Sequence, residues 1–376
     1  MGREDYLGEW SRMGRRLSGN YLSLLIALQE GPMDTLEELA ERVGYSRTTV
    51  SKYLRELQGR AKDNGRRYFR VIPDLNEKAL GLQTVDAFVE TSELAVIEDV
   101  EALCEKHPYT KYRSRCYGNY SGIFTQFRVP ISKTGKVRKM LEQKQTELCF
   151  DNYTVLPTVN TQPVFTVSSL EHWNVDSFTW NFDWEEWASQ DLSRREPSGR
   201  RTTESRLDIL NKKDFYILTK LGMGARRKQK EIIIELKKEG VEFTSQEFSR
   251  RYALLEENFI EGYHVFLDRE TFDLYSNVIL TARCPKEFGK ELQTRIELHP
   301  IPFRSTLKVK DDFIFWYLRL PQSHLSSLLN YLQQNVDKLT VSLVDYIQSQ
   351  VYALWAETFD EEKHQWKTND EFMMIG

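Results

Sequence analysis

Residues 18–58 carry apolar side chains at the spacing of amphipathic helices. Three helices are predicted there, with breaks at Gly31-Pro32 and at Gly44. The apolar positions of the last helix recur at i, i+3, i+4 and i+7, namely Val50, Tyr53, Leu54 and Leu57. Glycine tolerates the positive φ of a tight turn, so Gly44 suits the bend between the last two helices. The pattern predicts a helix-turn-helix.

The remaining faces of the last helix are polar and basic. Ser46 is placed to cap the helix, and Arg47 can bond a guanine edge while Lys52 bonds phosphate. The basic run that follows, RAKDNGRRYFRVI, predicts the strands of a wing at residues 65–72. The predicted DNA contacts of this unit are Ser46, Arg47, Thr48, Thr49, Ser51, Lys52, Arg55, Arg66 and Arg67. The alternative is an ordinary solvated helix face, but spacing, cap, wing and charge together favour DNA binding.

Strand and helix patterns alternate in residues 83–156. QTVDAFVE (83–90) alternates apolar and polar residues, and LAVIEDVEALCEK (94–106) has apolar residues at helical spacing. Two strands, TKYRSRCYG and GIFTQFRVP, follow, and then a helix at 133–146 and a strand at 148–156. The order β-α-β-β-α-β predicts an antiparallel four-stranded sheet with two helices on one face, the ferredoxin-like arrangement.

The second half of the chain repeats these patterns. HPYTKYRSRCYGNYSGIFTQFRVP (107–130) corresponds to HPIPFRSTLKVKDDFIFWYLRLP (299–321). Strands at NVILTAR, PFRSTLKV, FIFWYLRL and LTVSLVDY and helices at 285–297 and 321–335 repeat the ferredoxin-like series, and a further strand is expected after each copy, at about 162–170 and 349–357. The predicted fold class is α+β, with two tandem copies of a winged helix-turn-helix followed by a ferredoxin-like βαββαβ domain.

The helical unit of the second copy is less basic than that of the first. Its last helix, TSQEFSRRYALLEENFIEG, places Arg250 and Arg251 outward but also carries several glutamates. From Arg226 to Arg251, eight basic residues stand against five acidic ones. Arg250 and Arg251 are therefore candidate DNA contacts, and a purely structural or dimer-mimicking role is an equal alternative.

The composition of LSRREPSGRRTTES (192–205) predicts a solvated linker between the copies. The predicted organisation is a winged helix-turn-helix domain at 1–80, a ferredoxin-like domain with a C-terminal extension at 81–191, the linker at 192–205, a degenerate winged helix-like domain at 206–272, and a second ferredoxin-like domain with an extension at 273–376.

Charge is distributed unevenly along the chain. The 376 residues have a formal net charge of −4 and a pI near 6.0, which argues against coating of nucleic acid by the whole length. Residues 42–70 instead hold nine Lys or Arg against two acidic residues. This asymmetry predicts duplex DNA as a partner for that segment. No window approaches the roughly 18 uninterrupted apolar residues of a membrane-spanning helix, and no signal-peptide pattern is present, so we expect a cytoplasmic protein without a membrane partner.

These motifs resemble the Lrp/AsnC family of bacterial and archaeal transcription regulators. The helix-turn-helix and wing, LGLQTVDAFVE, the following helix and HPYTKYRSRCYGNYSGIFTQFRVP carry the resemblance, which covers residues 18–156 and, more faintly, 207–346. It implies a winged DNA-binding domain and ferredoxin-like domains that assemble a homodimer or higher oligomer and bind a small-molecule effector. Ser121 replaces the acidic residue usual after the turn, and Lys310-Asp311-Asp312 lacks the turn glycine, so an intact family effector pocket is not expected.

An enzyme is the alternative function. Proteins that resemble this family in fold include siroheme decarboxylases, whose chemistry requires a tetrapyrrole pocket. For such a pocket the sequence offers a generic set, namely His107, Arg113, Arg115 and Tyr117. The basic, well-capped helix instead favours a regulator that is not an enzyme.

Other chemistry has little support in the sequence. The four cysteines form no CxxC pair and the six histidines show no HxxxH or HExxH spacing, so neither a metal site nor a cofactor is predicted. His107 and His299 each precede a proline at a helix-to-strand junction, where an imidazole can satisfy helix-end carbonyls. Four tryptophans, at positions 173, 180, 184 and 187, lie among acidic residues that repel phosphate, and they are predicted to pack an arm on the protein or on a partner subunit rather than to stack on bases.

Overall fold

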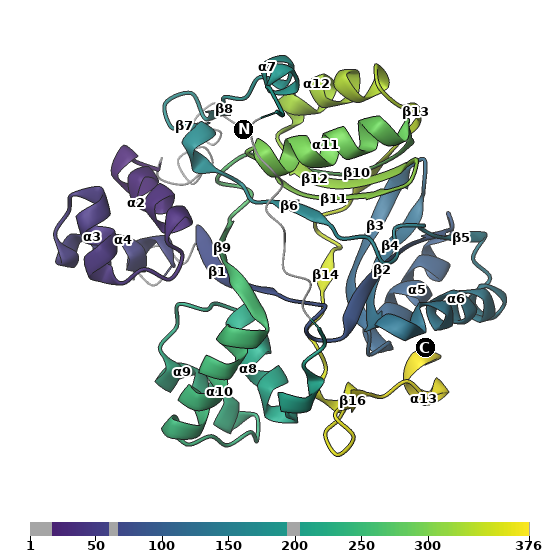
Figure 1. Cartoon of the computed structure of the whole chain (residues 1–376), viewed down its shortest axis with the longest axis horizontal. Coiled ribbons are helices and arrows are strands. Elements are labelled where there is room, and N and C mark those ends of the chain that lie inside the picture. Colours follow the sequence, from purple (N-terminus) through teal and green to yellow (C-terminus); the bar gives the residue numbers. More distant parts are fainter. Residues whose placement is uncertain (1–16, 60–66, 194–203, 376) are drawn as a thin grey trace, which may run out of the picture.

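The structure, a computed structural model, describes residues 17–59, 67–193 and 204–375. Its N-terminal part is a first helical unit of α2 (Gly19–Glu30), α3 (Leu36–Val43) and α4 (Arg47–Leu57), which lies at one side of the molecule (Figure 1). The apolar stripes of the three helices meet in one core, whose buried members include Leu24, Leu28, Leu39, Val50 and Leu54. The three predicted helices and both breaks between them are confirmed.

A second helical unit consists of α8 (Lys212–Gly222), α9 (Gln229–Lys238) and α10 (Ser245–Asn258). Each unit is followed by one strand, β1 (Phe69–Leu75) after the first and β9 (Ile260–Leu267) after the second. These strands pair antiparallel, from Phe69 opposite Leu267 to Asp74 opposite Gly262, and form a separate two-stranded sheet, here termed the β1–β9 ribbon. Both helical units are thus joined through one pair of strands.

This pairing corrects the predicted wing. The sequence predicted wing strands at residues 65–72 within the first unit, whereas β1 pairs with a strand of the second half of the chain. An alternating strand can pair with any complementary edge, so its pattern does not identify its partner. The part of the predicted wing at residues 60–66 lies outside the described residues.

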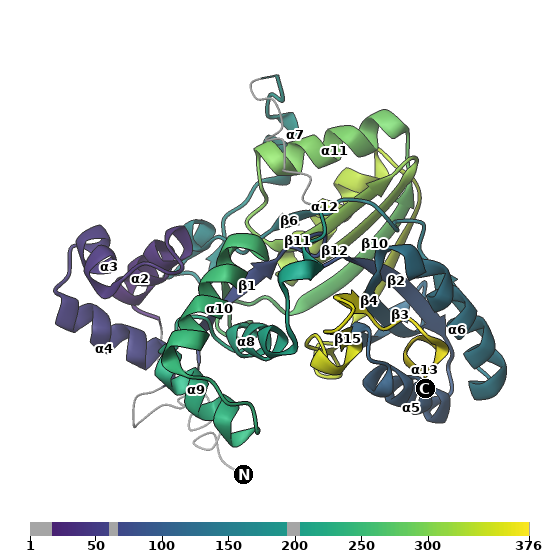
Figure 2. The ribbon, with the colours of Figure 1, turned by 60° about the horizontal axis from the view of Figure 1, so that its bottom comes forward.

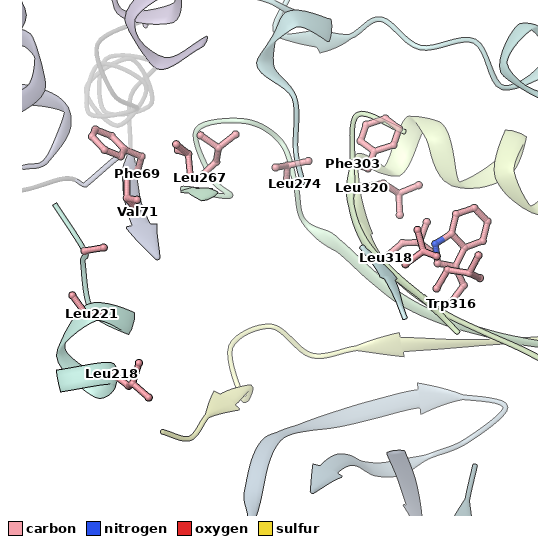
Figure 3. Packing of buried hydrophobic residues seen from close by; sticks show 14 of the residues in the cluster. Phe69, Val71, Leu218, Leu221, Leu267, Leu274, Phe303, Trp316, Leu318 and Leu320 are labelled. Atoms are coloured by element: carbon pink, nitrogen blue, oxygen red, sulfur yellow. The ribbon is translucent and has the colours of Figure 1, made fainter. Parts of the chain in front are cut away.

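The apolar face of the ribbon is part of a continuous hydrophobic core. Phe69 and Val71 of β1 and Leu267 of β9 are buried, and α8 packs on β1. Figure 3 shows these side chains between Leu218 and Leu221 of α8 on one side and Leu274 on the other. The ribbon is therefore held by apolar contacts to the second helical unit as well as by its backbone hydrogen bonds.

The other long strands form two half-sheets with the same order of elements. The first half-sheet unit contains β2 (Leu82–Glu90), α5 (Leu94–Lys106), β3 (Thr110–Gly118), β4 (Gly122–Pro130), α6 (Thr134–Leu148) and β5 (Asn152–Val155). The second contains β10 (Ser276–Arg283), α11 (Lys286–Leu298), β11 (Arg304–Lys310), β12 (Phe313–Leu320), α12 (Gln322–Gln333) and β13 (Asp337–Val344). The strand orders β5-β2-β4-β3 and β13-β10-β12-β11 are those expected of the β-α-β-β-α-β pattern. An origin of the two halves by duplication stays a prediction.

The half-sheets join at one edge and also face each other. β3 pairs with β13, so the sheet is continuous. Three strands separate β4 from β12 in this sheet, yet the ring centres of Phe124 and Phe315 lie 5.9 Å apart and the hydroxyl oxygens of Tyr112 and Tyr317 are 2.9 Å apart. The sheet therefore folds back on itself, with α5 and α6 on one outer face and α11 and α12 on the other (Figure 2).

A buried ion pair crosses the space between the half-sheets. Asp86 of β2 is fully buried and accepts hydrogen bonds from Gln126 Nε2 at 2.7 Å and Thr158 Oγ1 at 3.1 Å. Lys308 of β11, whose side chain is 4% exposed, places its Nζ 2.5 Å from Asp86 Oδ2. A buried charge without a partner is strongly destabilising, so this pair fixes the register of one half-sheet against the other.

The segment after each half-sheet packs on the opposite half. The first arm, residues 164–191, holds β6 (Val164–Thr166), β7 (Trp173–Asn174), β8 (Thr179–Trp180) and α7 (Trp184–Ser189). The second arm, residues 350–375, holds β14 (Gln350–Val351), β15 (Phe359–Asp360), β16 (Gln365–Trp366) and α13 (Asp370–Met373). β6 pairs with β11 and β14 pairs with β3, so the arms are exchanged between the halves. The additional strands expected after each copy are confirmed.

Tryptophans attach both arms. The four tryptophans of the first arm are buried, and Nε1 of Trp187 donates to the carbonyl of His299 at 2.7 Å. In the second arm, Nε1 of Trp366 donates to the carbonyl of Leu80 at 2.7 Å. The predicted packing of the tryptophan-rich arm is confirmed, and its covered rings leave no face for a nucleic-acid base.

His107 lies beneath the second arm. Its Nδ1 accepts the backbone N–H of Tyr109 at 3.3 Å, and its Nε2 is 3.2 Å from the carbonyl of Met373 at the end of α13. Burial lowers the pKa of His107 to about 4, against the opposing effect of that carbonyl. The sequence predicted that this imidazole satisfies a helix-end carbonyl, and it does. The carbonyl belongs to α13 of the second arm.

We expect Lys308→Met to lower the free energy of unfolding by about 3–5 kcal/mol, because Asp86 would keep a buried charge without a cation. Lys310→Met, at the exposed end of the same strand, should change it by less than about 0.5 kcal/mol. Urea denaturation measures both. Partial recovery in Asp86→Asn/Lys308→Met is the expected result of removing both charges, whereas equal stability of the two single variants would contradict the role of the pair.

The pKa of His107 predicts that acid destabilises the fold. The unfolded chain takes up the proton near pH 6.5 and the folded protein only near pH 4, so stability falls as the pH drops from about 6.5 to about 4. His107→Asn should weaken the pH dependence of the free energy of unfolding across this window. His364→Asn, at an exposed site, should leave that dependence unchanged, and identical slopes in all three proteins would refute the assignment.

Candidate nucleic-acid interface

The turn between α3 and α4 is fixed by caps on both sides. Thr35 caps α3, because its side chain accepts from the N–H of Glu38 while the Glu38 carboxylate accepts from the N–H of Thr35. Gly44 adopts φ 70° at the end of α3, a left-handed conformation that favours glycine. Ser46 Oγ then accepts from the N–H of Thr49 and begins α4. The helix-turn-helix geometry is therefore set by local sequence.

The inner face of α4 packs on the first helical unit. Val50, Leu54 and Leu57 are buried, and Tyr53 stacks at a tilt on Tyr21 of α2 with ring centres 4.8 Å apart. This packing places the opposite face of α4 toward solvent and restrains rotation of the helix about its axis. A helix held in this way can present side chains to a groove of DNA in a defined orientation.

The exposed face of α4 carries most of the predicted contacts. Arg47, Thr48, Lys52 and Arg55 are exposed, while Thr49 and Ser51 are half-buried. No acidic residue of α4 lies in its own first turn, which favours approach of a phosphate to the helix N-terminus. Arg67 is exposed after the helix, and Arg66 lies outside the described residues.

Two of these side chains already have partners within the first unit. Nε of Arg47 lies 2.6 Å from Oε1 of Glu37, but both side chains are more than half exposed, so this ion pair is weak and can be exchanged for a phosphate or a base. Ser46 Oγ contacts Thr49 Oγ1 at 2.9 Å in addition to its cap. Ser46 and Thr49 thus shape the start of α4, whereas the guanidinium of Arg47 is exposed at the surface.

The second helical unit does not present a matching surface. Arg251 points inward, where its Nε lies 2.7 Å from Oδ1 of Asp214 and its Nη2 donates to the carbonyl of Ile209 at 2.9 Å. Asp214 is fully buried, which raises its pKa, and the bonds from Arg251 oppose that rise. The expectation that Arg251 points outward to DNA is therefore wrong, because α8 supplies a buried carboxylate to it. Arg250 is exposed, as the sequence predicted.

Other basic residues of the second unit are also engaged within the protein. Arg227 Nη1 lies 2.7 Å from Glu235, and Arg226 Nη1 donates to the carbonyl of Pro32 at 2.9 Å. The first turn of α10 contains Glu247, which contacts Lys213 at 2.8 Å. These basic residues of the second unit thus contact its own fold or the first unit, whereas Lys228 and Lys230 are exposed.

The generic residues of the enzyme alternative do not converge on one pocket. Arg113 and Arg115 both contact Glu101, at 2.7 and 2.8 Å, while His107 is buried beneath the second arm and Tyr117 is half exposed. Within the described residues no group of three or more His, Cys, Asp or Glu side chains is arranged to hold a metal ion. No helix in that part of the chain has the length and apolar character needed to span a membrane.

Residues 20–60 match the IclR helix-turn-helix domain, so the first helical unit is a helix-turn-helix domain. No curated protein is detectably similar to the chain. Among solved structures, the siroheme decarboxylase NirDL is 12% identical, with 94% of this chain and 96% of that chain covered and a TM-score of 0.47.

The structures of two Lrp/AsnC-type regulators are similar to part of the chain. E. coli AsnC is 18% identical over 37% of this chain and 89% of its own, with a TM-score of 0.27. The Mycobacterium tuberculosis leucine response regulatory protein LrpA is 20% identical over 38% of this chain and 92% of its own, with a TM-score of 0.26. Likenesses at this level of identity and superposition carry no argument about function.

The neighbouring arginines of α10 should differ sharply in their effect on stability. Arg251→Ala leaves the buried Asp214 carboxylate without its cation and should cost about 3–5 kcal/mol in the free energy of unfolding. Arg250→Ala removes an exposed side chain and should cost less than about 0.5 kcal/mol. Chemical denaturation of both variants tests this, and a similar cost for the two would show that Arg251 is not an internal partner.

Proposed function

We propose that the protein is a DNA-binding transcription regulator that contacts duplex DNA through α4. The observation that carries this proposal is the rigid, capped α4, whose exposed face holds Arg47, Thr48, Lys52 and Arg55 within a domain that matches a helix-turn-helix family. Arg47 is positioned to bond a guanine edge, and Lys52 and Arg55 to bond phosphate. Such a protein acts in the cytoplasm, where it meets DNA, and the proposal assigns it no enzymatic activity.

The DNA site is proposed to be asymmetric. The two helical units have the same series of three helices and one strand, but α10 carries Glu247 in its first turn and turns Arg251 inward. We therefore assign sequence-specific contacts to the first unit, with Arg250 as a backbone contact if the second unit approaches DNA. The second unit supports the first through the β1–β9 ribbon and through the Arg226 contact to Pro32.

In a homodimer, the inner face of one subunit's sheet can be covered by the other subunit. We propose that the folded-back sheet achieves the same coverage within one chain. Its two half-sheets cover each other's inner faces, and each arm packs on the opposite half. This arrangement supports a tandem origin and the predicted division into two helix-turn-helix and two ferredoxin-like parts. Assembly of whole chains into a homodimer or higher oligomer is a further part of the proposal.

DNA recovered by selection from a random pool provides the test, with affinities measured by fluorescence anisotropy. Arg47→Ala should cost about 1–3 kcal/mol of binding free energy and relax specificity at one base pair. Lys52→Ala should weaken binding to all sequences alike and lower the slope of log affinity against log salt by about one. Both side chains are exposed, so neither change should unfold the protein.

Arg250→Ala is the matched control, because it removes an exposed arginine from the other candidate helix. It should leave specificity unchanged and alter affinity less than Arg47→Ala does. An Arg47→Ala/Lys52→Ala variant that binds the selected DNA as tightly as the wild type would overturn the proposal. A palindromic selected site would indicate that the first units of two chains bind it together, whereas an asymmetric site would indicate that both units of one chain contact it.

A further inference from the structure

Four arginine side chains gather where the β1–β9 ribbon meets the second half-sheet. The arginine cluster consists of Arg70 on β1, Arg269 directly after β9, Arg304 on β11 and Arg319 on β12. The guanidinium carbons of Arg70, Arg304 and Arg319 lie 4.6, 4.8 and 5.2 Å from the centre of the Phe266 ring. Arg269 lies over the ring of Tyr346, and the like charge of Arg319 acts on it. Residues far apart in the sequence thus bring four cations to one place.

The cluster differs from most other semi-buried arginines of the described residues; Arg226, which donates to the Pro32 carbonyl, is an exception. Arg113 and Arg115 contact Glu101, Arg128 contacts Glu77, and Arg227 and Arg251 have their own carboxylates. Among the described residues, by contrast, no carboxylate forms an ion pair with any member of the cluster. Among the side chains that the structure describes, the one hydrogen-bond partner of the cluster is Asn277, whose Oδ1 accepts from Arg319 Nε at 3.0 Å. Within the described residues, most other semi-buried arginines thus have an acidic partner, whereas these four have none.

Three polar nitrogens around the cluster are buried without a hydrogen-bond partner in the described part of the chain. They are Nη1 of Arg269, Nη1 of Arg304 and Nε2 of His264. Arg269 as a whole is only 7% exposed, and Arg304 and His264 line one small cavity together with Arg319. Buried donors that lack a partner are rare in native proteins and point to an absent ligand or ion.

The excess of positive charge in the cluster also favours a bound anion. Burial lowers the pKa of Arg304 to about 10 and that of Arg269 to about 9, and in both cases repulsion from Arg319 adds to the effect. The facing groups that oppose this shift are Asp74 and the hydroxyls of Tyr112, Tyr317 and Tyr346. Asp74 Oδ1 already lies 2.7 Å from His264 Nδ1, so the carboxylate that acts on Arg304 within the described residues is already engaged. An anion in the cluster would remove this imbalance.

Stacking on aromatic rings does not account for the arrangement. A cation over a ring gains a modest attraction, but the ring offers nothing to the in-plane N–H groups of a guanidinium. Three arginines on the single ring of Phe266 also repel one another. The planar fork of each guanidinium matches the paired oxygens of a carboxylate or a phosphate.

We propose that the arginine cluster is a binding site for a small organic anion that carries carboxylate or phosphate groups. The cavity beside His264, Arg304 and Arg319 is ≈ 10 Å³, which is about the space of one water molecule. One oxygen of the anion fits there beside Arg304, whose Nη1 is a buried donor without a partner among the described residues, and the flexible arginine side chains move from the Phe266 ring to surround the rest. A ligand with two or more anionic groups matches the excess of positive charge.

The site also lies on the connection between the helical units and the folded-back sheet. Arg70 and Phe266 belong to the β1–β9 ribbon, whereas Arg304 and Arg319 belong to the second half-sheet. Ser168 of the first arm lines the same cavity, and its carbonyl accepts from Gln29 of α2, whose Oε1 accepts from the N–H of Leu170 at 2.9 Å. An anion that draws these parts together shifts the first helical unit against the sheet. Regulation of DNA binding by this shift rests on the proposed function, whereas anion binding does not.

Calorimetric titration of the full chain with citrate and, separately, with pyrophosphate tests the site at constant ionic strength. The wild type should bind at least one of them, and which one it binds distinguishes a carboxylate from a phosphate ligand. Arg304→Gln should weaken binding by at least about tenfold, because it removes a charge-assisted donor pair. Arg250→Gln, at an exposed site, should bind as the wild type does. Failure of the wild type to bind either probe, or equal binding by Arg304→Gln, overturns the proposal.

Thermal melting separates the ligand role from a structural one. Without an added anion, Arg304→Gln should melt at the wild-type temperature or above it, since Nη1 has no partner among the described residues and the repulsion between the arginines decreases. The bound anion should raise the melting temperature of the wild type but not that of Arg304→Gln. A lower melting temperature for Arg304→Gln, with no effect of either probe on the wild type, would show that the arginine is merely structural.

Regulation is tested by repeating the DNA titration with and without the bound probe. The probe should change the DNA affinity of the wild type at least about threefold and leave that of Arg304→Gln unchanged. An unchanged affinity in the wild type refutes the regulatory coupling. Absence of any DNA binding refutes the proposed function, and the calorimetric result on the anion stands apart from it.

Discussion

Burial of the inner faces of the two half-sheets is the constraint on which the rest of the structure depends. Each half-sheet has helices on its outer face only, so its inner face would be exposed if the half stood alone. The sheet folds back so that Phe124 and Phe315 meet, and the buried Asp86 and Lys308 require each other across the gap. Exchange of the two arms strengthens the same contact, because each arm ends on the half that did not precede it.

The β1–β9 ribbon transmits this pairing to the helical units. Because each strand follows one unit directly, the two units cannot be oriented independently of each other or of the second half-sheet. The units nevertheless use their surfaces differently. The basic side chains of α4 are exposed to solvent, whereas Arg251 of α10 contacts the buried Asp214. Similar folds thus present one exposed basic face, to which we assign DNA binding, and another face that stabilises the framework.

The elements and the start of the candidate interface could be predicted because they follow from local patterns. The cap of Ser46, the turn at Gly44 and the apolar stripe of α4 involve residues within a few positions of one another. The inward turn of Arg251 could not be predicted, because its partner lies on another helix and is identified only by the packing of α10 on α8. Arg304 and Lys308 are four residues apart in β11 and therefore lie on the same face of the strand. This spacing in the sequence was the available indication that the face is not purely apolar.

The sequence by itself determined the order of helices and strands, the helix-turn-helix with its exposed basic face, and the ferredoxin-like order in each half. Those features depend on periodicity and on capping between near neighbours. Only the tertiary structure decided that β1 pairs with β9, that the arms are exchanged and that Arg70, Arg269, Arg304 and Arg319 meet. An alternating strand is compatible with many partners, and contacts between residues far apart in the chain are selected by the burial of the whole surface, which no local pattern encodes.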